Sequence, residues 1–177
     1  RQLAVVPYGV LPEPPPASGD ALEHEMRTWR AAGKLVLCYV ASATTSHDQR
    51  LLFNALPFVD ARLKVLCVFF GGPHAVATAA WPADGPVTVR VAAPDAAVRQ
   101  YTHETDFLVL PSGDGDQPLA VLEAFCDQVP VVASRVPELL EFIDDKQTGW
   151  LFDPSEPQAL AATLTLARTT APHALRA

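Results

Sequence analysis

Short runs dominated by apolar residues alternate with amphipathic segments along most of the chain. Such runs are typical of parallel strands that are covered on both faces of their sheet. Their lengths and their flanking Gly, Pro and Asp residues favour strands over helices. We therefore predict strands at residues 35–41, 65–70, 87–91, 107–110 and 130–134.

The segments between these runs carry apolar residues at helical spacing. In residues 48–59, for example, Leu52, Ala55 and Leu56 fall on one helical face. Prolines, glycines and capping residues such as Asp95 set the expected helix ends. The predicted helices are residues 21–32, 48–59, 74–80, 95–104, 118–127, 137–143 and 157–167, with an apolar segment, Trp150–Phe152, between the last two. Strands that alternate with helices imply βαβ crossovers, and hence an α/β fold with a Rossmann-like, doubly wound parallel sheet.

The N-terminal residues differ from this pattern. Residues 1–10 are expected to form a short apolar strand, and the proline-rich residues 10–20 an extended linker or loop, because proline disrupts regular structure. The chain starts with neither a signal peptide nor an initiator sequence, so we expect an excised domain. Residues 1–177 have the length of a single domain.

Composition and charge exclude several classes of function. The net charge is −7 and the 13 Lys and Arg residues are scattered, which argues against nucleic-acid binding. No apolar run approaches the roughly 20 residues that span a bilayer. Cys38, Cys67 and Cys126 lie far apart in apolar segments without metal-ligand spacing, so we expect buried thiols in a reducing, cytoplasmic compartment. The absence of a dinucleotide fingerprint and of a Gly-x-Ser-x-Gly elbow disfavours nicotinamide enzymes and serine hydrolases.

The most informative segment joins the strand at 107–110 to the helix at 118–127. Between them lies a loop of small and acidic residues, Pro111–Gln117, and the helix carries one carboxylate, Glu123. A parallel sheet presents such a helix N-terminus at the carboxyl edge of its strands, where unpaired N–H groups attract an anion. An anionic ligand is therefore expected at this loop.

Motifs that occur together in one enzyme family lie in order along nearly the whole chain. They are Val6–Gly9, Phe70–Pro73, Tyr101–Ser112, Gln117–Ala124, Pro130–Ser134 with Pro137 and Glu138, and Thr148–Phe152. Together they resemble the C-terminal, donor-binding half of GT-B glycosyltransferases of the retaining group 1, or family 4, type. The segment Gln117–Ala124, for example, is similar to the family's Gln-Pro-Leu-x-x-Leu-Glu-Ala.

The resemblance implies an activity and the partners that it needs. Such enzymes transfer a sugar from a nucleotide diphosphosugar, with UDP or GDP as the nucleotide, to an acceptor. They retain the anomeric configuration, usually without a metal or other cofactor, and a hexosyltransferase is implied. The N-terminal GT-B domain, which would supply the acceptor site and the usual catalytic histidine, is absent from this chain. The isolated domain is therefore expected to be inactive.

The family's donor-site residues can be assigned here by position. Glu123 matches the glutamate that holds the ribose hydroxyls, and a carboxylate can accept hydrogen bonds from both hydroxyls of a vicinal diol. Gln117, Pro118, Leu119 and Ala120 match the start of the helix, whose backbone amides approach the diphosphate. Pro118 has no N–H, which is normal at the first helical position.

Other positions depart from the family pattern. Gly115 stands where the family has the glutamate that contacts the transferred sugar, and Gln128 replaces a helix-ending glycine. Ala41, Ser42 and His47 stand where the family has Gly-Arg and Lys, whose charges neutralise the diphosphate. Losing two cations and a carboxylate removes on the order of 5–9 kcal/mol at about 1.5–3 kcal/mol for each charged hydrogen bond. Because micromolar binding amounts to about 8 kcal/mol, donor binding should be severely weakened.

Asp114 and Asp116 flank Gly115 and are the candidate catalytic residues. Three interpretations are open: an acidic turn, a contact with the sugar hydroxyls, or a divalent cation that bridges the diphosphate, as in Asp-x-Asp motifs of GT-A enzymes. A protonated His47 would restore some positive charge. Two alternatives to an active enzyme also remain. One is a catalytically degenerate GT-B-like domain that acts as a binding or scaffolding partner, and the other is an unrelated Rossmann-like module for another phosphorylated ligand.

Overall fold

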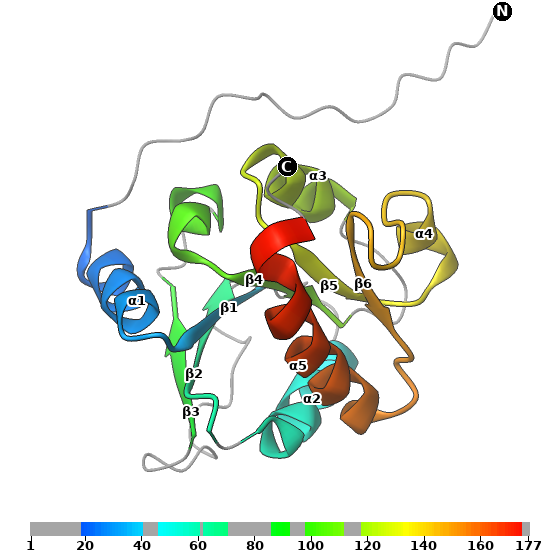
Figure 1. Cartoon of the computed structure of the whole chain (residues 1–177), viewed down its shortest axis with the longest axis horizontal. Coiled ribbons are helices and arrows are strands. Elements are labelled where there is room, and N and C mark those ends of the chain that lie inside the picture. The colour runs from blue at the N-terminus through cyan, green and yellow to red at the C-terminus, as the bar shows by residue number, and fades with distance from the viewer. Residues whose placement is uncertain are drawn as a thin grey trace, which may run out of the picture.

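A six-stranded, entirely parallel sheet forms the centre of the computed structural model, which describes residues 19–40, 46–60, 62–70, 86–92, 98–111 and 118–174 (Figure 1). The side chains of residues 46–48 and 171–174 lie outside this description. The strands are β1 (Leu35–Val40), β2 (Val65–Phe70), β3 (Val87–Val91), β4 (Phe107–Leu110), β5 (Val131–Ser134) and β6 (Gly149–Phe152). Their order across the sheet is β3-β2-β1-β4-β5-β6, so the direction of winding reverses between β1 and β4. The predicted doubly wound α/β fold is confirmed.

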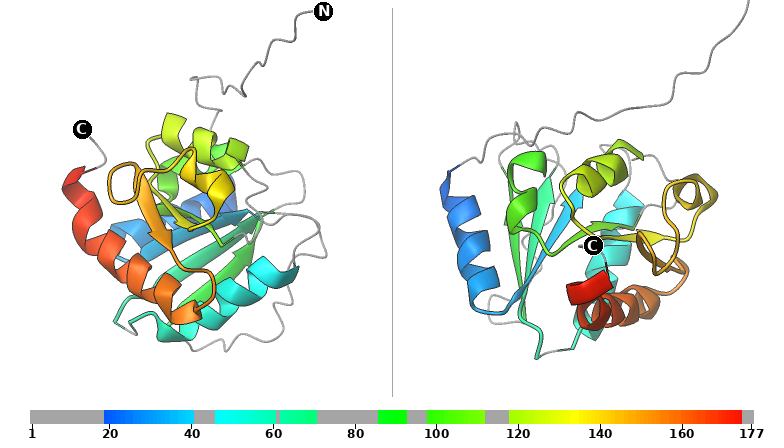
Figure 2. Two further views of the ribbon diagram at one scale, coloured as in Figure 1. Left: turned by 90° about the vertical axis from the view of Figure 1, so that its right-hand side faces the viewer. Right: turned by 45° about the horizontal axis from the view of Figure 1, so that its top comes forward.

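Helices cover both faces of the sheet (Figure 2). They are α1 (Ala21–Ala31), α2 (Ser46–Ala55), α3 (Pro118–Cys126), α4 (Pro137–Leu140) and α5 (Pro157–Ala174), with short 3-10 helices η1 (Leu56–Phe58), η3 (Val98–Gln100) and η4 (Thr102–Glu104). Helices α2 and α5 pack on one face, and α1, α3, α4 and the η3–η4 segment pack on the other. None of the helices described is both long enough and apolar enough to cross a membrane.

Alternate residues of the central strands face the two layers, because successive side chains of a strand point to opposite faces. Leu37 and Tyr39 of β1 join the core beneath α2 and α5, whereas Val36 and Cys38 join the core beneath α1 and α3. Burial on both sides explains why the strands read as continuous apolar runs. The predicted limits of β2, β3 and β4 are confirmed to the residue.

The ends of α1 and α3 follow ordinary capping rules. Asp20 caps α1 by accepting a hydrogen bond from the backbone N–H of Glu23 at 2.9 Å. At the end of α3, Val129 N donates to Ala124 O at 2.8 Å and Gln128 N donates to Phe125 O at 3.1 Å, which is a Schellman motif. Gln128 takes the left-handed conformation there, with φ 58°. It therefore occupies, at a steric cost, the conformation that favours glycine.

The predicted helix over residues 95–104 is wrong for the part that the structure describes. Residues 98–104 form two 3-10 turns, in which Tyr101 N donates to Val98 O and Glu104 N to Tyr101 O. Threonine hydroxyls compete for the carbonyls in this segment, since Thr102 Oγ1 donates to Arg99 O and Thr105 Oγ1 to Tyr101 O.

Several other predicted ends also need correction. Helix α2 ends at Ala55 and continues only as η1, because Pro57 lacks the N–H that an α-helix would use. Helix α4 ends at Leu140 instead of residue 143, whereas α5 runs beyond residue 167 to Ala174. The apolar segment Trp150–Phe152, with Gly149, forms the edge strand β6.

The expected burial of the cysteines is confirmed for Cys38 and Cys67 and is wrong for Cys126. Cys126 lies in the last turn of α3, outside the buried stripe that Ala120 and Ala124 form against the sheet. The strand predicted at residues 1–10, most of the linker, the helix at 74–80 and the cap at Asp95 lie outside the described residues.

Candidate functional site

The edge of the sheet between β1 and β4 is the geometric candidate for a ligand site. All six strands are parallel, so their carboxyl ends share one edge, and the winding reverses between these two strands. A crevice forms at such a reversal, because the following chain segments diverge to opposite faces of the sheet. Helix α3 follows β4 and begins with Pro118, so its N-terminus belongs to this edge (Figure 1).

The first turn of α3 combines a buried and an exposed side chain. Ala120 is buried against the sheet, whereas 42% of the Leu119 side chain is exposed. The buried stripe of Ala120, Val121 and Ala124 fixes the helix to the core. The amides of the first turn have no intrahelical acceptors, so they can donate to an anionic ligand.

Glu123 lies in the second turn of α3 and is partly buried. Among the described residues, none donates a hydrogen bond to its carboxylate. Partial burial raises the pKa of the Glu123 carboxyl, the positive charge of Arg99 lowers it, and the negative charge of Asp127 raises it. A half-buried carboxylate without a protein donor is a strong acceptor for hydroxyl groups of a ligand.

Asp127, one turn after Glu123, is held by residues from another segment. Arg99 of η3 donates to it through Nη2 at 2.7 Å and Nε at 3.1 Å. Thr102 Oγ1 lies 2.8 Å from Asp127 Oδ2. This contact was not predicted, because Arg99 and Asp127 are 28 positions apart and neither belongs to a motif that marks the pair.

The structure describes only some of the site residues that the sequence predicts. Pro118, Leu119, Ala120 and Glu123 lie together on α3. The predicted sites Ala41, Ser42, Asp114, Asp116 and Gln117, together with Gly115, lie outside the described residues. His47 belongs to α2, but its side chain is outside the description. The roles assigned to these residues therefore stay predictions.

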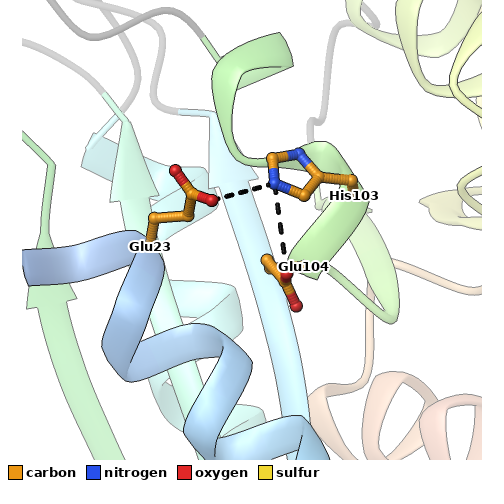
Figure 3. A group of neighbouring side chains, drawn as sticks. All are labelled: Glu23, His103 and Glu104. Carbon is orange, nitrogen blue, oxygen red and sulfur yellow. Dashed lines mark hydrogen bonds and ion pairs between the residues drawn. The ribbon is translucent and has the colours of Figure 1, made fainter. Parts of the chain in front are cut away.

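A second cluster of titratable groups lies between α1 and η4 (Figure 3). Glu23, His103 and Glu104 offer ligand atoms that lie within 4.8 Å of one another, so a metal ion would fit the spacing. Arg27 already bridges the two carboxylates, however, at 2.6 Å from Glu23 Oε1 and 2.8 Å from Glu104 Oε1. Arg30 adds a further positive charge, 3.7 Å from Glu104 Oε2. The charges of this cluster are thus balanced by arginines, which makes it an ion-pair network that joins α1 to η4.

The two buried cysteines are unsuited to catalysis. Burial raises the pKa of the Cys38 thiol to about 12, and its sulfur lies 2.8 Å from Thr105 Oγ1. Burial also raises the pKa of Cys67 far above its usual range. A nucleophilic cysteine needs an accessible thiolate, so these thiols are part of the core.

Comparisons with known proteins identify the family of this chain and structures that share its fold. Residues 34–167 match the family model for glycosyl transferases group 1. A relative in Erwinia amylovora, the amylovoran biosynthesis glycosyltransferase AmsK, is 38% identical over 77 residues, which are 40% of this chain and 19% of AmsK.

Solved structures share the fold. Anabaena HepE, in complex with UDP and glucose, superposes with a TM-score of 0.64 at 16% identity, over 90% of this chain and 45% of HepE. The C-terminal domain of LpcC, a glycosyl transferase group 1 family protein from Francisella tularensis, gives a TM-score of 0.63 at 15% identity, over 91% of this chain and 88% of that domain. The chain thus has the Rossmann-like fold of the C-terminal half of a GT-B glycosyltransferase and spans less than half of HepE. Because the family model covers most of its length, the chain belongs to the group 1 glycosyl transferases.

Proposed function

We propose that this chain is the donor-binding domain of an enzyme that transfers a hexose from a UDP- or GDP-sugar to an acceptor, with retention of configuration. The observation that carries the proposal is the Glu123 carboxylate. It is partly buried, none of the described residues donates to it, and it lies on the helix that follows β4 at the reversal of the sheet. Its two oxygens suit the vicinal hydroxyls of a ribose.

The diphosphate is assigned to the N-terminus of α3. The backbone amides of Leu119 and Ala120 belong to the first helical turn, where the helix dipole also favours negative charge. UDP is the first ligand to test, because HepE was solved with UDP and glucose. Asp114 or Asp116 would then contact the transferred sugar in place of the glutamate that Gly115 replaces, without a metal ion.

The acceptor site is assigned to an N-terminal GT-B domain outside this chain. The chain covers 45% of HepE and 19% of AmsK, which supports a larger whole protein. The isolated domain is then expected to bind a donor without transferring its sugar. The unpaired, buried thiols of Cys38 and Cys67 support a cytoplasmic location.

A degenerate domain that serves as a binding or scaffolding partner is the second candidate. It is favoured by the residues at three positions where the family has charged groups: Ser42, His47 and Gly115. Loss of two cations and a carboxylate would remove on the order of 5–9 kcal/mol of donor binding, if each charged hydrogen bond contributes about 1.5–3 kcal/mol.

Calorimetric titration with UDP, GDP and their sugars distinguishes the two candidates. The donor-binding proposal predicts saturable binding of one nucleotide series and an about 10- to 100-fold weaker affinity in Glu123→Gln, because charge-assisted hydrogen bonds are lost. The matched control is Glu156→Gln, an exposed glutamate that precedes α5 on the other face of the sheet. Absence of heat at millimolar ligand, or equal effects of the two substitutions, would reject donor binding at Glu123.

A further inference from the structure

The ion pair between Arg99 and Asp127 is the most enclosed charged pair of the α3 region. The side chains of Arg99 and Asp127 are only 12% and 6% exposed. The guanidinium donates two hydrogen bonds to the carboxylate, from Nη2 and from Nε, at 2.7 and 3.1 Å. Such a bidentate contact fixes the orientation of both groups as well as their distance.

The pair connects the segment between β3 and β4 with the C-terminal end of α3, the helix that carries Glu123. Arg99 belongs to η3, in the stretch between β3 and β4, and Asp127 directly follows the last residue of α3. Thr102, which is 5% exposed, places its hydroxyl 2.8 Å from Asp127 Oδ2 and 3.0 Å from Arg99 O, so its single proton is shared between these two acceptors of the same cluster. The contact therefore ties the end of α3 to the residues that lead into β4.

Helix α3 needs a positive charge that its own sequence does not supply. Its last turn contains no basic residue. Asp127 N donates to Glu123 O at 3.1 Å, so the two carboxylates are four residues apart on one side of the helix. Like charges at this spacing repel, and the C-terminal end of a helix disfavours anions. Arg99 supplies the missing cation from another part of the fold.

This cation also acts on Glu123 without forming a hydrogen bond to it. Burial has the largest influence on the pKa of Glu123 and raises it. Arg99 and Asp127 are the charged groups that the described structure places near Glu123, and their effects on its pKa are opposite: Arg99 lowers it, whereas Asp127 acts in the same direction as burial. Since the guanidinium is engaged with Asp127, the Glu123 oxygens stay open to a ligand.

We propose that Arg99 is a positioning residue for nucleotide binding: it fixes α3 through Asp127 and offsets that residue's charge, so that Glu123 is an ionised and open acceptor for the ribose. This inference rests on the proposed function. It assigns Arg99 no contact with the substrate. The charge of Arg99 also favours the ionised form of Glu123, which an ion pair that only stabilised the fold would not need to do.

The test uses two substitutions that break the same pair with opposite electrostatic results. Arg99→Gln removes the cation and leaves Asp127 charged, so the titration midpoint of Glu123 should rise. Asp127→Asn removes the like charge and leaves Arg99, so the midpoint should fall. Carbon NMR of the carboxyl group follows both midpoints in the nucleotide-free protein, which separates this test from the question of whether UDP binds.

Calorimetry with UDP then gives the functional result. In Arg99→Gln the loss of affinity at about pH 5 should exceed that at about pH 8 by about three- to tenfold, because a higher midpoint leaves less carboxylate at the lower pH. Arg99→Lys keeps the positive charge but cannot form the two-hydrogen-bond guanidinium contact. It should leave the titration midpoint of Glu123 near that of the unmodified protein.

Two outcomes would overturn the inference. Midpoints that do not move in either variant, or that move in the same direction in both, would make Arg99 a merely structural residue. If Arg99→Gln does not fold, a midpoint in Asp127→Asn that fails to fall leads to the same conclusion. Absence of UDP binding in the unmodified protein would instead reject the proposed function, while the NMR midpoints would still decide the electrostatic role of Arg99.

Discussion

Glu23 in α1 and Glu123 in α3 have different surroundings, although both helices pack on the same face of the sheet. Glu23 is 3% exposed and accepts hydrogen bonds on both oxygens, from Gly19 N at 2.5 Å and from Arg27 Nη2 at 2.6 Å. In addition, His103 Nε2 lies 3.2 Å from Glu23 Oε1 (Figure 3). Glu123 is only partly buried, and none of the described residues donates to it. One acceptor is thus satisfied within the fold, whereas the other is open to a ligand.

The difference shows how local donors decide the role of a carboxylate. A buried charge stabilises a fold only where hydrogen bonds and an opposite charge replace the water that it has lost. Glu23 meets this condition and therefore holds α1 to η4. Glu123 loses water without gaining a donor among the described residues, and burial accordingly raises its pKa. Such an energetic cost is expected at a residue whose role is to bind a ligand and not to stabilise the fold.

The largest expected effect is the loss of the satisfied carboxylate. Glu23→Ala should lower the free energy of unfolding by about 2–4 kcal/mol, because it removes a buried ion-pair partner and part of the N-terminal cap of α1. Urea unfolding measures this change. The matched control is Glu141→Ala, an exposed site after α4 that should change stability by less than about 0.5 kcal/mol. A similar loss in both variants, or weakened UDP binding in Glu23→Ala, would remove the contrast with Glu123.

A smaller effect is expected at the end of α3, where the chain is strained. Gln128 has a φ of 58°, so Gln128→Gly should raise the free energy of unfolding by about 0.5–1 kcal/mol, the steric cost of the left-handed conformation less the entropy of glycine. Thermal and urea unfolding measure the gain. The substitution keeps Glu123 and Asp127 in place, so UDP affinity should be unchanged. If Gln128→Gly destabilised the protein, the assigned Schellman geometry would be wrong.

The smallest effect concerns the open carboxylate itself. Because the pKa of Glu123 is raised in the folded protein from the usual 4.5, the folded state holds its proton to higher pH than the unfolded state does. The group therefore contributes its full stabilisation below the usual glutamate pKa. This contribution is lost as the pH rises through the pKa that the group has in the folded protein. The free energy of unfolding of Glu123→Gln, relative to that of the unmodified protein, should accordingly rise from about pH 4 to about pH 7. Unfolding at both pH values measures the gain, and a relative loss over this range would contradict the sign.

Much of the fold can be predicted from the sequence, because burial on both faces gives the strands a distinctive pattern. The runs at Val65–Phe70 and Phe107–Leu110 contain only apolar residues, and both strands have the predicted limits. The 3-10 turns of residues 98–104 could not be read in this way. Their geometry depends on threonine hydroxyls that bond to the backbone, and no apolar periodicity records such bonds.

The candidate site is predictable only in part. Glu123 was found because its helix follows a strand and a loop in one continuous segment. Arg99 was missed, because its partner Asp127 is distant in sequence and the pair exists only once η3 and α3 are packed. For the same reason the sequence could not distinguish Glu23 from Glu123, since the donors of Glu23 include His103, which lies 80 positions away.

The most direct test of donor binding is a crystal structure of the protein with UDP. We predict that both ribose hydroxyls lie within hydrogen-bond distance of the Glu123 carboxylate, with the diphosphate at the amides of Leu119 and Ala120. A nucleotide bound elsewhere, or a ribose that makes no contact with Glu123, would contradict this prediction.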